Sequence, residues 1–259
     1  MKKIVLTLYI GVIISGILTN TFAQDTPANK TSHQKLSSRF FTIDSLHNLW
    51  DELLQEHVSH DGKVNYSSFK NDREAILNYI NVLTLLSSKD EFKALSKNDK
   101  LAYWINAYNA LTVDLIIRNY PVKSIKDIKD PWNQKFYTFN GEQLSLNQIE
   151  HDILRKMDEP RIHFAIVCAS QSCPKLSNEA YIADKLEQQL TDATKDFLND
   201  KAKNKITNND LELSKIFKWF AKDFKQNGSL IDFLNQYAEV NISEDAKIKY
   251  RDYNWDLND

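Results

Sequence analysis

The residues best suited to chemistry lie in one short segment, His163 to Pro174. It holds both cysteines of the chain, Cys168 and Cys173, with four residues between them. A cysteine thiolate is a nucleophile, whereas two cysteines this close together in an oxidising compartment can also form a disulfide. A free thiol would allow nucleophilic catalysis by Cys168. A Cys168–Cys173 disulfide would instead hold their loop, which includes Ser170, rigid at the rim of a pocket.

Nucleophilic catalysis by Cys168 requires a base close to the sulfur. Residues 161–168, RIHFAIVC, are almost entirely apolar and predict a central β-strand that is covered on both faces. In a regular strand, His163 and Cys168 point to opposite faces and lie about 16 Å apart, which excludes a direct pair. His151 precedes this strand on a predicted helix, with Glu150 beside it, and is therefore the better candidate base. The alternatives are that His151 is a surface residue of its helix and that His163 is a hydrogen-bonded core residue rather than a ligand-binding one.

Two asparagines interrupt a helix that is predicted from about residue 98 to residue 119. The helix is apolar around most of its circumference, as expected for a helix in the middle of a domain. Asn106 and Asn109 are three residues apart and share one face of it. Because a buried amide costs free energy unless its hydrogen bonds are made, these side chains either brace neighbouring backbone or line a binding pocket. In the second case they could also orient the imidazole of His151.

A zinc site is a weaker alternative. Two histidines and two cysteines, all common zinc ligands, fall within 23 residues, namely His151, His163, Cys168 and Cys173. However, the C-x4-C spacing is looser than the usual C-x2-C, and the chain has no H-x3-H or H-E-x-x-H pair. The motifs of lipases, P-loop nucleotidases and dinucleotide-binding enzymes are also absent from the sequence. We therefore expect neither a metal nor a cofactor.

Five motifs in a specific order resemble a known family. They are a turn at residues 61–66, YWINAYNA at 103–110, LSLNQIEHDILR at 144–155, HFAIVCASQSCPKL at 163–176 and YNWDLN at 253–258. Together they resemble the domain-of-unknown-function family 547, from about Leu46 to the C-terminus. Because the family's activity is not established, the resemblance implies no reaction. It implies only that the motif positions form the functional surface, and these are Asn106, Asn109, Glu150, His151, His163, Cys168 and Cys173.

The composition predicts a helix-rich α+β fold. Glycine and proline are scarce, with five of each, which disfavours a sandwich or barrel with many turns. Hairpins are predicted at residues 136–144 and 206–213, and a last strand is predicted in the tail, residues 247–258. We expect a single domain with a small, mostly antiparallel sheet and the buried helix at its centre. Papain-like and transglutaminase-like thiol enzymes are a fold-level analogy only, since the buried helix here lacks their cysteine.

The N-terminus carries an expected export signal. Lys2 and Lys3 precede an apolar run of 15 residues, and small residues before a cut after Ala23 complete a signal peptide over residues 1–23. The run is short for a membrane span, so we expect none after cleavage. These features predict a periplasmic or secreted protein.

The remainder of the chain is expected to form a leader and one domain. Residues 24–39 are polar and predict a disordered leader, and residues 40–259 have the length of one globular domain. The formal net charge of −2 gives no basic patch for nucleic acid, which we exclude as a partner. The oligomeric state does not follow from the sequence.

Two functions remain open. The first is a thiol-dependent hydrolase or acyl transferase for peptide-like substrates, with Cys168 as nucleophile and His151 and Glu150 assisting. The second is a non-catalytic module that binds a small molecule, peptide or protein with a loop fixed by a Cys168–Cys173 disulfide. The state of the two thiols distinguishes them.

Overall fold

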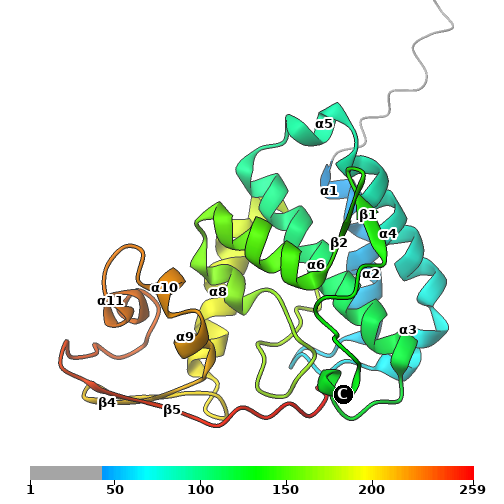
Figure 1. The fold of residues 1–259 in the computed structure, drawn as a ribbon. Helices are drawn as coiled ribbons and strands as arrows, with labels where there is room; N and C mark the ends of the chain where they lie inside the picture. The colour runs from blue at the N-terminus through cyan, green and yellow to red at the C-terminus, as the bar shows by residue number, and fades with distance from the viewer. Residues whose placement is uncertain (1–42) are drawn as a thin grey trace, which may run out of the picture. The chain divides into compact units, whose positions relative to one another are not determined.

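Helix α6 (Lys97–Asn119) runs through the middle of the unit formed by residues 41–259 (Figure 1). Its first turn is closed by a capping box, in which Ser96 and Asp99 bond to each other's backbone N–H. Every residue from Leu101 to Ile117 is buried. The predicted buried helix is therefore confirmed, and it is the element against which the others pack.

The computed structural model describes residues 43–259. The predicted signal peptide, residues 1–23, and the predicted leader, residues 24–39, lie outside the described residues. Within the described part, no helix is both long and apolar enough to cross a membrane.

One side of α6 is covered by helices from the first part of the chain. These are α1 (Ile43–Leu46), α2 (Asn48–His57), α3 (Tyr66–Asn71), α4 (Arg73–Ser87) and α5 (Asp90–Lys93). The stripe of apolar residues on α2 and α4 faces inward, and Trp50 stacks on Tyr79 with ring centroids 5.7 Å apart. This burial forms the larger of two hydrophobic clusters and fixes the position of α6.

A hairpin and a mixed helix follow α6 and the short turn η1 (Ile125–Asp127). Strands β1 (Tyr137–Phe139) and β2 (Glu142–Leu144) pair antiparallel around Asn140 and Gly141, which both have positive φ, as in a tight hairpin turn. The hairpin prediction is confirmed. Helix α7 (Leu146–Gln148) then continues as a π-helical turn, η2 (Ile149–Ile153), and a 3-10 turn, η3 (Leu154–Met157).

The predicted central strand over residues 161–168 is wrong. The segment forms a 3-10 turn, η4 (Pro160–Phe164), and then irregular backbone that is buried through Val167. Pro160 starts the turn, and the Glu159 side chain accepts from the N–H of Arg161 at 3.1 Å. The apolar run predicted the burial correctly, but such a run does not distinguish a buried strand from other buried backbone.

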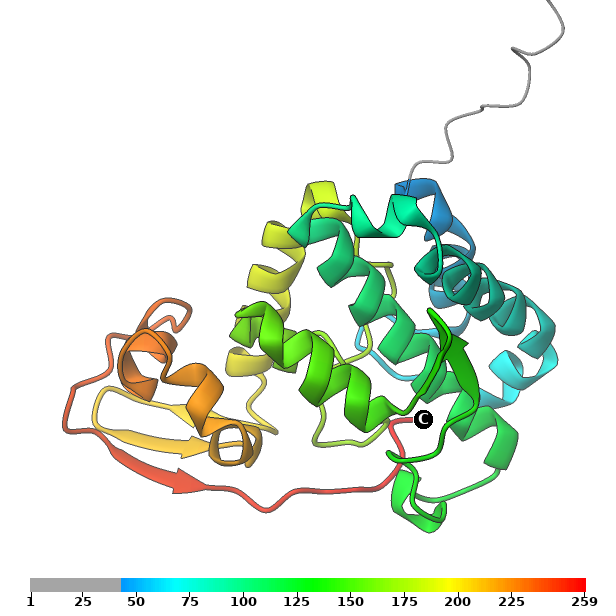
Figure 2. The same ribbon diagram turned by 45° about the horizontal axis from the view of Figure 1, so that its top comes forward.

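The second hydrophobic cluster lies at the other end of the unit. Helix α8 (Leu186–Asn199), preceded by η5 (Ala183–Lys185), packs against η4 and carries Phe197 and Leu198 into this cluster. Strands β3 (Lys205–Ile206), β4 (Asp210–Leu213) and β5 (Lys247–Tyr250) form a sheet in which β3–β4 is antiparallel and β4–β5 is parallel. Helices α9 (Ile216–Trp219), α10 (Ala221–Phe224) and α11 (Leu230–Asn235) cover one face of it (Figure 2).

The C-terminal tail joins the two clusters. After β5 the chain runs back to the first cluster (Figure 1), so only residues 247–250 of the predicted last strand form one. Backbone N–H groups of Gln171 and Ser172 donate to the carbonyls of Asp256 (2.8 Å) and Asn254 (3.2 Å). The α+β class is confirmed, and residues 43–259 contain two small sheets rather than one central sheet.

Candidate functional site

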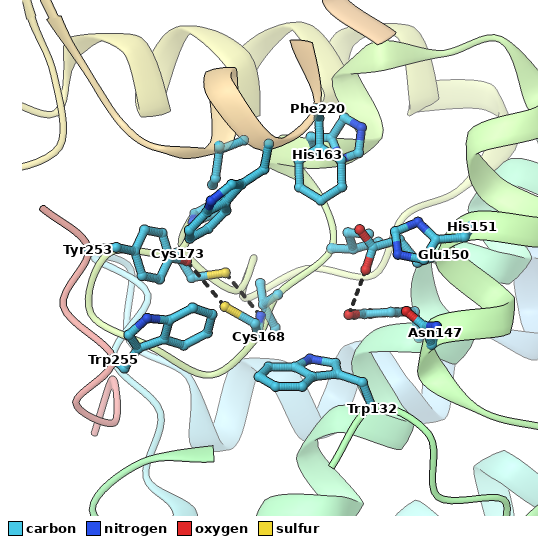
Figure 3. Close-up of a pocket in the computed structure, with 16 residues that line it drawn as sticks. Trp132, Asn147, Glu150, His151, His163, Cys168, Cys173, Phe220, Tyr253 and Trp255 are labelled. Atoms are coloured by element: carbon cyan, nitrogen blue, oxygen red, sulfur yellow. Dashed lines mark hydrogen bonds between the residues drawn. The ribbon is translucent and has the colours of Figure 1, made fainter. Parts of the chain in front are cut away.

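A pocket of about 270 Å³ lies where η2, the Cys168 loop, α9 and the C-terminal tail meet (Figure 3). Five residues singled out in the sequence line it, namely Glu150, His151, His163, Cys168 and Cys173. Its walls also contain six aromatic side chains, namely Tyr108, Trp132, Trp219, Phe220, Tyr253 and Trp255. The predicted chemical groups therefore share one cavity with an aromatic lining.

The two cysteines are free thiols in this structure. Cys168 is half-buried and Cys173 is buried. The backbone N–H of Cys168 donates to the Cys173 Sγ atom at 3.0 Å. The Cys168 Sγ atom lies 3.2 Å from both the Ser170 Oγ atom and the Tyr253 hydroxyl. The disulfide expected as one alternative is not formed here.

These contacts make the two thiols unequal. The hydrogen bond with Cys173 lowers the pKa of Cys168 although burial opposes it, and the hydroxyls of Ser170 and Tyr253 lower it further. Burial raises the pKa of Cys173, and the neighbouring Cys168 raises it more. Of the two thiols, Cys168 therefore ionises more readily.

The backbone next to Cys168 has an uncommon conformation. Ala169 is fully buried and has a φ of +57°, a left-handed geometry that costs a non-glycine residue on the order of 1 kcal/mol or more. The N–H of Asn258 donates to its carbonyl at 3.4 Å, and carbonyls of the tail accept from the N–H groups of Gln171 and Ser172. The surrounding structure thus maintains this turn directly after the thiol.

Glu150 lies across the pocket from Cys168 in Figure 3. It is carried by the π-helical turn η2, a feature that is frequent at functional sites. The hydroxyl of Tyr108, from α6, donates to its Oε2 atom at 3.2 Å. Burial raises the pKa of Glu150 to about 7, even though Tyr108 and Arg155 favour the carboxylate. This side chain can therefore hold or release a proton near neutral pH.

The two histidines line the pocket and also belong to a hydrogen-bond network with Arg155 and Asp223. Arg155 donates two hydrogen bonds to the Asp223 carboxylate (2.6 and 2.8 Å) and one to the Nδ1 atom of His151 (2.9 Å). The Nε2 atom of His163 lies 2.8 Å from the Oδ2 atom of Asp223, and its ring stacks on Phe220 with centroids 3.9 Å apart. His163 is thus a hydrogen-bonded buried residue, one of the two alternatives expected for it.

His151 is not arranged as the base expected for Cys168. Because its Nδ1 atom accepts from Arg155, the neutral ring carries its proton on Nε2. Burial lowers the pKa of His151, and the Arg155 charge lowers it further. Among the described residues, the side-chain partners of the Cys168 sulfur are hydroxyls and the Cys173 thiol rather than an imidazole. The argument that excluded His163 as a base assumed a regular strand, which this segment does not form. His163 is nevertheless bonded to Asp223 rather than to the Cys168 sulfur.

The paired asparagines brace the backbone. Asn109 donates to the Ala165 carbonyl (2.9 Å) and accepts from the Val167 N–H (3.0 Å), so its amide makes the bonds that a neighbouring strand would make. Asn106 does the same for the carbonyl and N–H of Tyr181 (2.7 and 3.0 Å). Of the two expected roles, bracing is the one observed, and neither residue lines the pocket.

The residues of the zinc alternative do not form a ligand group. In residues 43–259, the side chains close enough to share a metal ion are Glu56, His57 and Asp72, which lie away from the pocket. Ser170 is buried and is not among the residues that line the pocket, but its hydroxyl bonds the Cys168 sulfur and the Tyr253 hydroxyl.

The sequence analysis missed most of the pocket's lining. Tyr253 and Trp255 lie in the tail motif that supported the family resemblance, and this motif was the available signal. Trp132 lies in a loop and Trp219 at the end of α9, where no local pattern marks them. Only the fold brings these rings together.

Comparison with family models finds one match. Residues 92–198 match the model of a family described as "Protein of unknown function, DUF547". The resemblance to this family is confirmed for that segment. A search of curated proteins finds no match, and neither does a search of solved structures. The motifs at residues 61–66 and 253–258 lie outside the matched segment.

The pocket combines the DUF547 segment with residues that follow it. Glu150, His151 and Cys168 come from the matched residues. Trp219 and Tyr253 come from the C-terminal part. The site is thus complete only when the C-terminal tail is in place.

Proposed function

We propose that this protein is an exported thiol-dependent hydrolase or acyl transferase that acts on small peptide-like substrates in the aromatic pocket. The observation that carries the proposal is the environment of the Cys168 sulfur. It lies on a cavity, and its pKa is lowered by the Cys173 thiol and two hydroxyls. Such an environment is typical of reactive rather than structural cysteines. Export is part of the proposal and is supported by residues 1–23 alone.

In the proposed reaction, the Cys168 thiolate attacks the carbonyl carbon of the substrate. The S–C bond forms and the bond to the leaving group breaks, while Glu150 passes to that group the proton that its carboxylate took from the Cys168 thiol. Water or another acceptor then attacks the thioester and returns its proton to the Glu150 carboxylate. The acyl group leaves with the acceptor, and the sulfur takes back its electron pair.

His151 has a different role in this scheme from the one expected. With Nδ1 held by Arg155, it offers an Nε2–H donor to a substrate oxygen. Glu150 is the better proton carrier because its pKa of about 7 is close to the operating pH.

The test uses an activated ester, p-nitrophenyl acetate, and intact-mass and peptide-map spectrometry of the full chain. We expect one acetyl group on Cys168 and none in the Cys168→Ala variant. Glu150→Gln should slow release of the acyl group, whereas the exposed Glu142→Gln serves as a matched control that leaves it unchanged. A folded protein without an adduct on Cys168 would contradict the proposal and favour a non-catalytic binding module.

A further inference from the structure

Part of the pocket is lined by four aromatic rings, each in contact with at least one of the others and here named the aromatic wall. They are Trp132, Trp219, Tyr253 and Trp255. The Trp255 ring centroid lies 4.6 Å from that of Tyr253, 5.8 Å from that of Trp132 and 5.9 Å from that of Trp219. The wall is more than the catalytic scheme requires, since attack on a carbonyl needs no aromatic surface.

The carboxyl of Glu150 shares the cavity with this wall. Figure 3 shows it on the opposite side from Tyr253 and Trp255. Among residues 43–259, the hydrogen-bond partner of the Glu150 carboxyl is the Tyr108 hydroxyl at 3.2 Å. An acid in this position gains a charge partner when a cation enters the cavity.

The other charged groups near Glu150 are largely paired with each other. The guanidinium of Arg155 is bonded to the Asp223 carboxylate through two hydrogen bonds, and Asp223 also bonds His163. Lys126 lies over the Trp255 ring at 5.1 Å but does not line the pocket. Among its described lining residues, the cavity thus contains an acid without a paired cation and no lysine or arginine.

We propose that the pocket binds an organic ammonium group of the substrate between the aromatic wall and Glu150. Aromatic faces attract cations through their quadrupole, and cages of such rings recognise alkylated ammonium groups in particular. A carboxylate adds charge attraction that is strong in a partly desolvated site. The inference rests on the proposed function only in that the ammonium group belongs to the acyl substrate.

The binding should depend on pH. Glu150 is protonated in the empty pocket below about pH 7, and the cation favours the carboxylate. Affinity should therefore rise as the pH increases through 7, with release of a proton on binding. The titratable groups near Glu150 are Tyr108, Arg155, Asp223, Cys168 and His151. None of the first three is expected to titrate in this range, and burial and the Arg155 charge lower the pKa of His151.

The test compares choline with dimethylbutanol, its neutral isostere in which a tert-butyl group replaces trimethylammonium. Binding to the full-length Cys168→Ala chain is measured by calorimetry at pH 6 and pH 8, so that no turnover is involved. We expect choline to bind at least about tenfold more tightly than the alcohol at pH 8, with a smaller preference at pH 6. Glu150→Gln should remove most of the preference, and Glu142→Gln should retain it.

Equal affinity for the two probes, or an unchanged preference in Glu150→Gln with a native circular dichroism spectrum, would overturn the inference. Trp255→Leu provides a second variant, which should reduce choline affinity even if Glu150→Gln fails to fold. The outcome is independent of the acyl-adduct experiment. Choline selectivity without an adduct on Cys168 refutes the catalysis alone, and an adduct without selectivity refutes the cation site alone.

Discussion

The Cys168 loop and the Glu150 turn face the same pocket but are held in different ways. The loop is fixed by polar bonds, from the Asn109 amide on one side and from the C-terminal tail on the other. The turn is fixed mainly by apolar packing, with Ile149 and Leu154 fully buried, and the Glu150 carboxyl is left with one hydroxyl partner.

This difference suits the two groups. The sulfur needs hydrogen-bond donors that stabilise the thiolate, and the loop provides them together with a strained residue at Ala169. The carboxyl needs few donors, because poor solvation is what raises its pKa towards neutrality. Polar bonds thus position the Cys168 sulfur and lower its pKa. Around the Glu150 carboxyl such bonds are few, and this raises its pKa.

The largest effect should come from removing the brace. We expect Asn109→Ala to lower the free energy of unfolding by about 2–5 kcal/mol, because the Ala165 carbonyl and Val167 N–H would be left buried without partners. Urea denaturation measures this change. Asn119→Ala is the matched control, since this exposed residue on the same helix makes one bond, to the Leu115 carbonyl. A loss no larger than that of the control would show that the loop does not depend on Asn109.

A smaller effect of opposite sign is expected at Glu150. In the folded protein this acid retains a proton up to about pH 7 that the unfolded chain releases near pH 4.3, so the parent loses stability as the pH rises between these values. Glu150→Gln does not titrate and should be more stable than the parent by about 3–4 kcal/mol at pH 8. At pH 4 the two should be nearly equal, because Glu150 is then protonated in both states.

Urea denaturation at pH 4, 6 and 8 tests this, with Glu142→Gln as a control that shows no such trend. If the free energy of unfolding of Glu150→Gln does not exceed that of the parent at pH 8, the Glu150 carboxyl is better solvated than its surroundings indicate. The contrast between the two sides of the pocket would then be lost.

The sequence predicted those features that local patterns determine. The apolar circumference of α6 predicted its burial, and Asn140-Gly141 predicted the hairpin turn. Because a buried amide must make its hydrogen bonds, two roles were open to Asn106 and Asn109, and the bracing of neighbouring backbone is the one observed. Part of the segment from His163 to Pro174, which was singled out for its chemistry, lines the pocket.

Features that depend on distant contacts were not predicted. The apolar run at residues 161–168 predicts a strand. In the structure, however, the backbone of Ala165 and Val167 bonds to the side chain of Asn109, more than 50 residues earlier, rather than to another strand. The role expected for His151 failed because Arg155, which is fixed by the distant Asp223, occupies its Nδ1 atom. Tyr253 reaches the sulfur from the end of the chain, which no local pattern reveals.

The most direct test is the pH dependence of alkylation of the two cysteines by iodoacetamide, followed residue by residue with mass spectrometry. We predict that Cys168 reacts first, with a midpoint below the value of about 8.5 for a free cysteine, and that Tyr253→Phe moves the midpoint upward. Equal labelling of Cys173, or a Cys168 midpoint at or above that of a free cysteine, would contradict an activated thiol in this pocket.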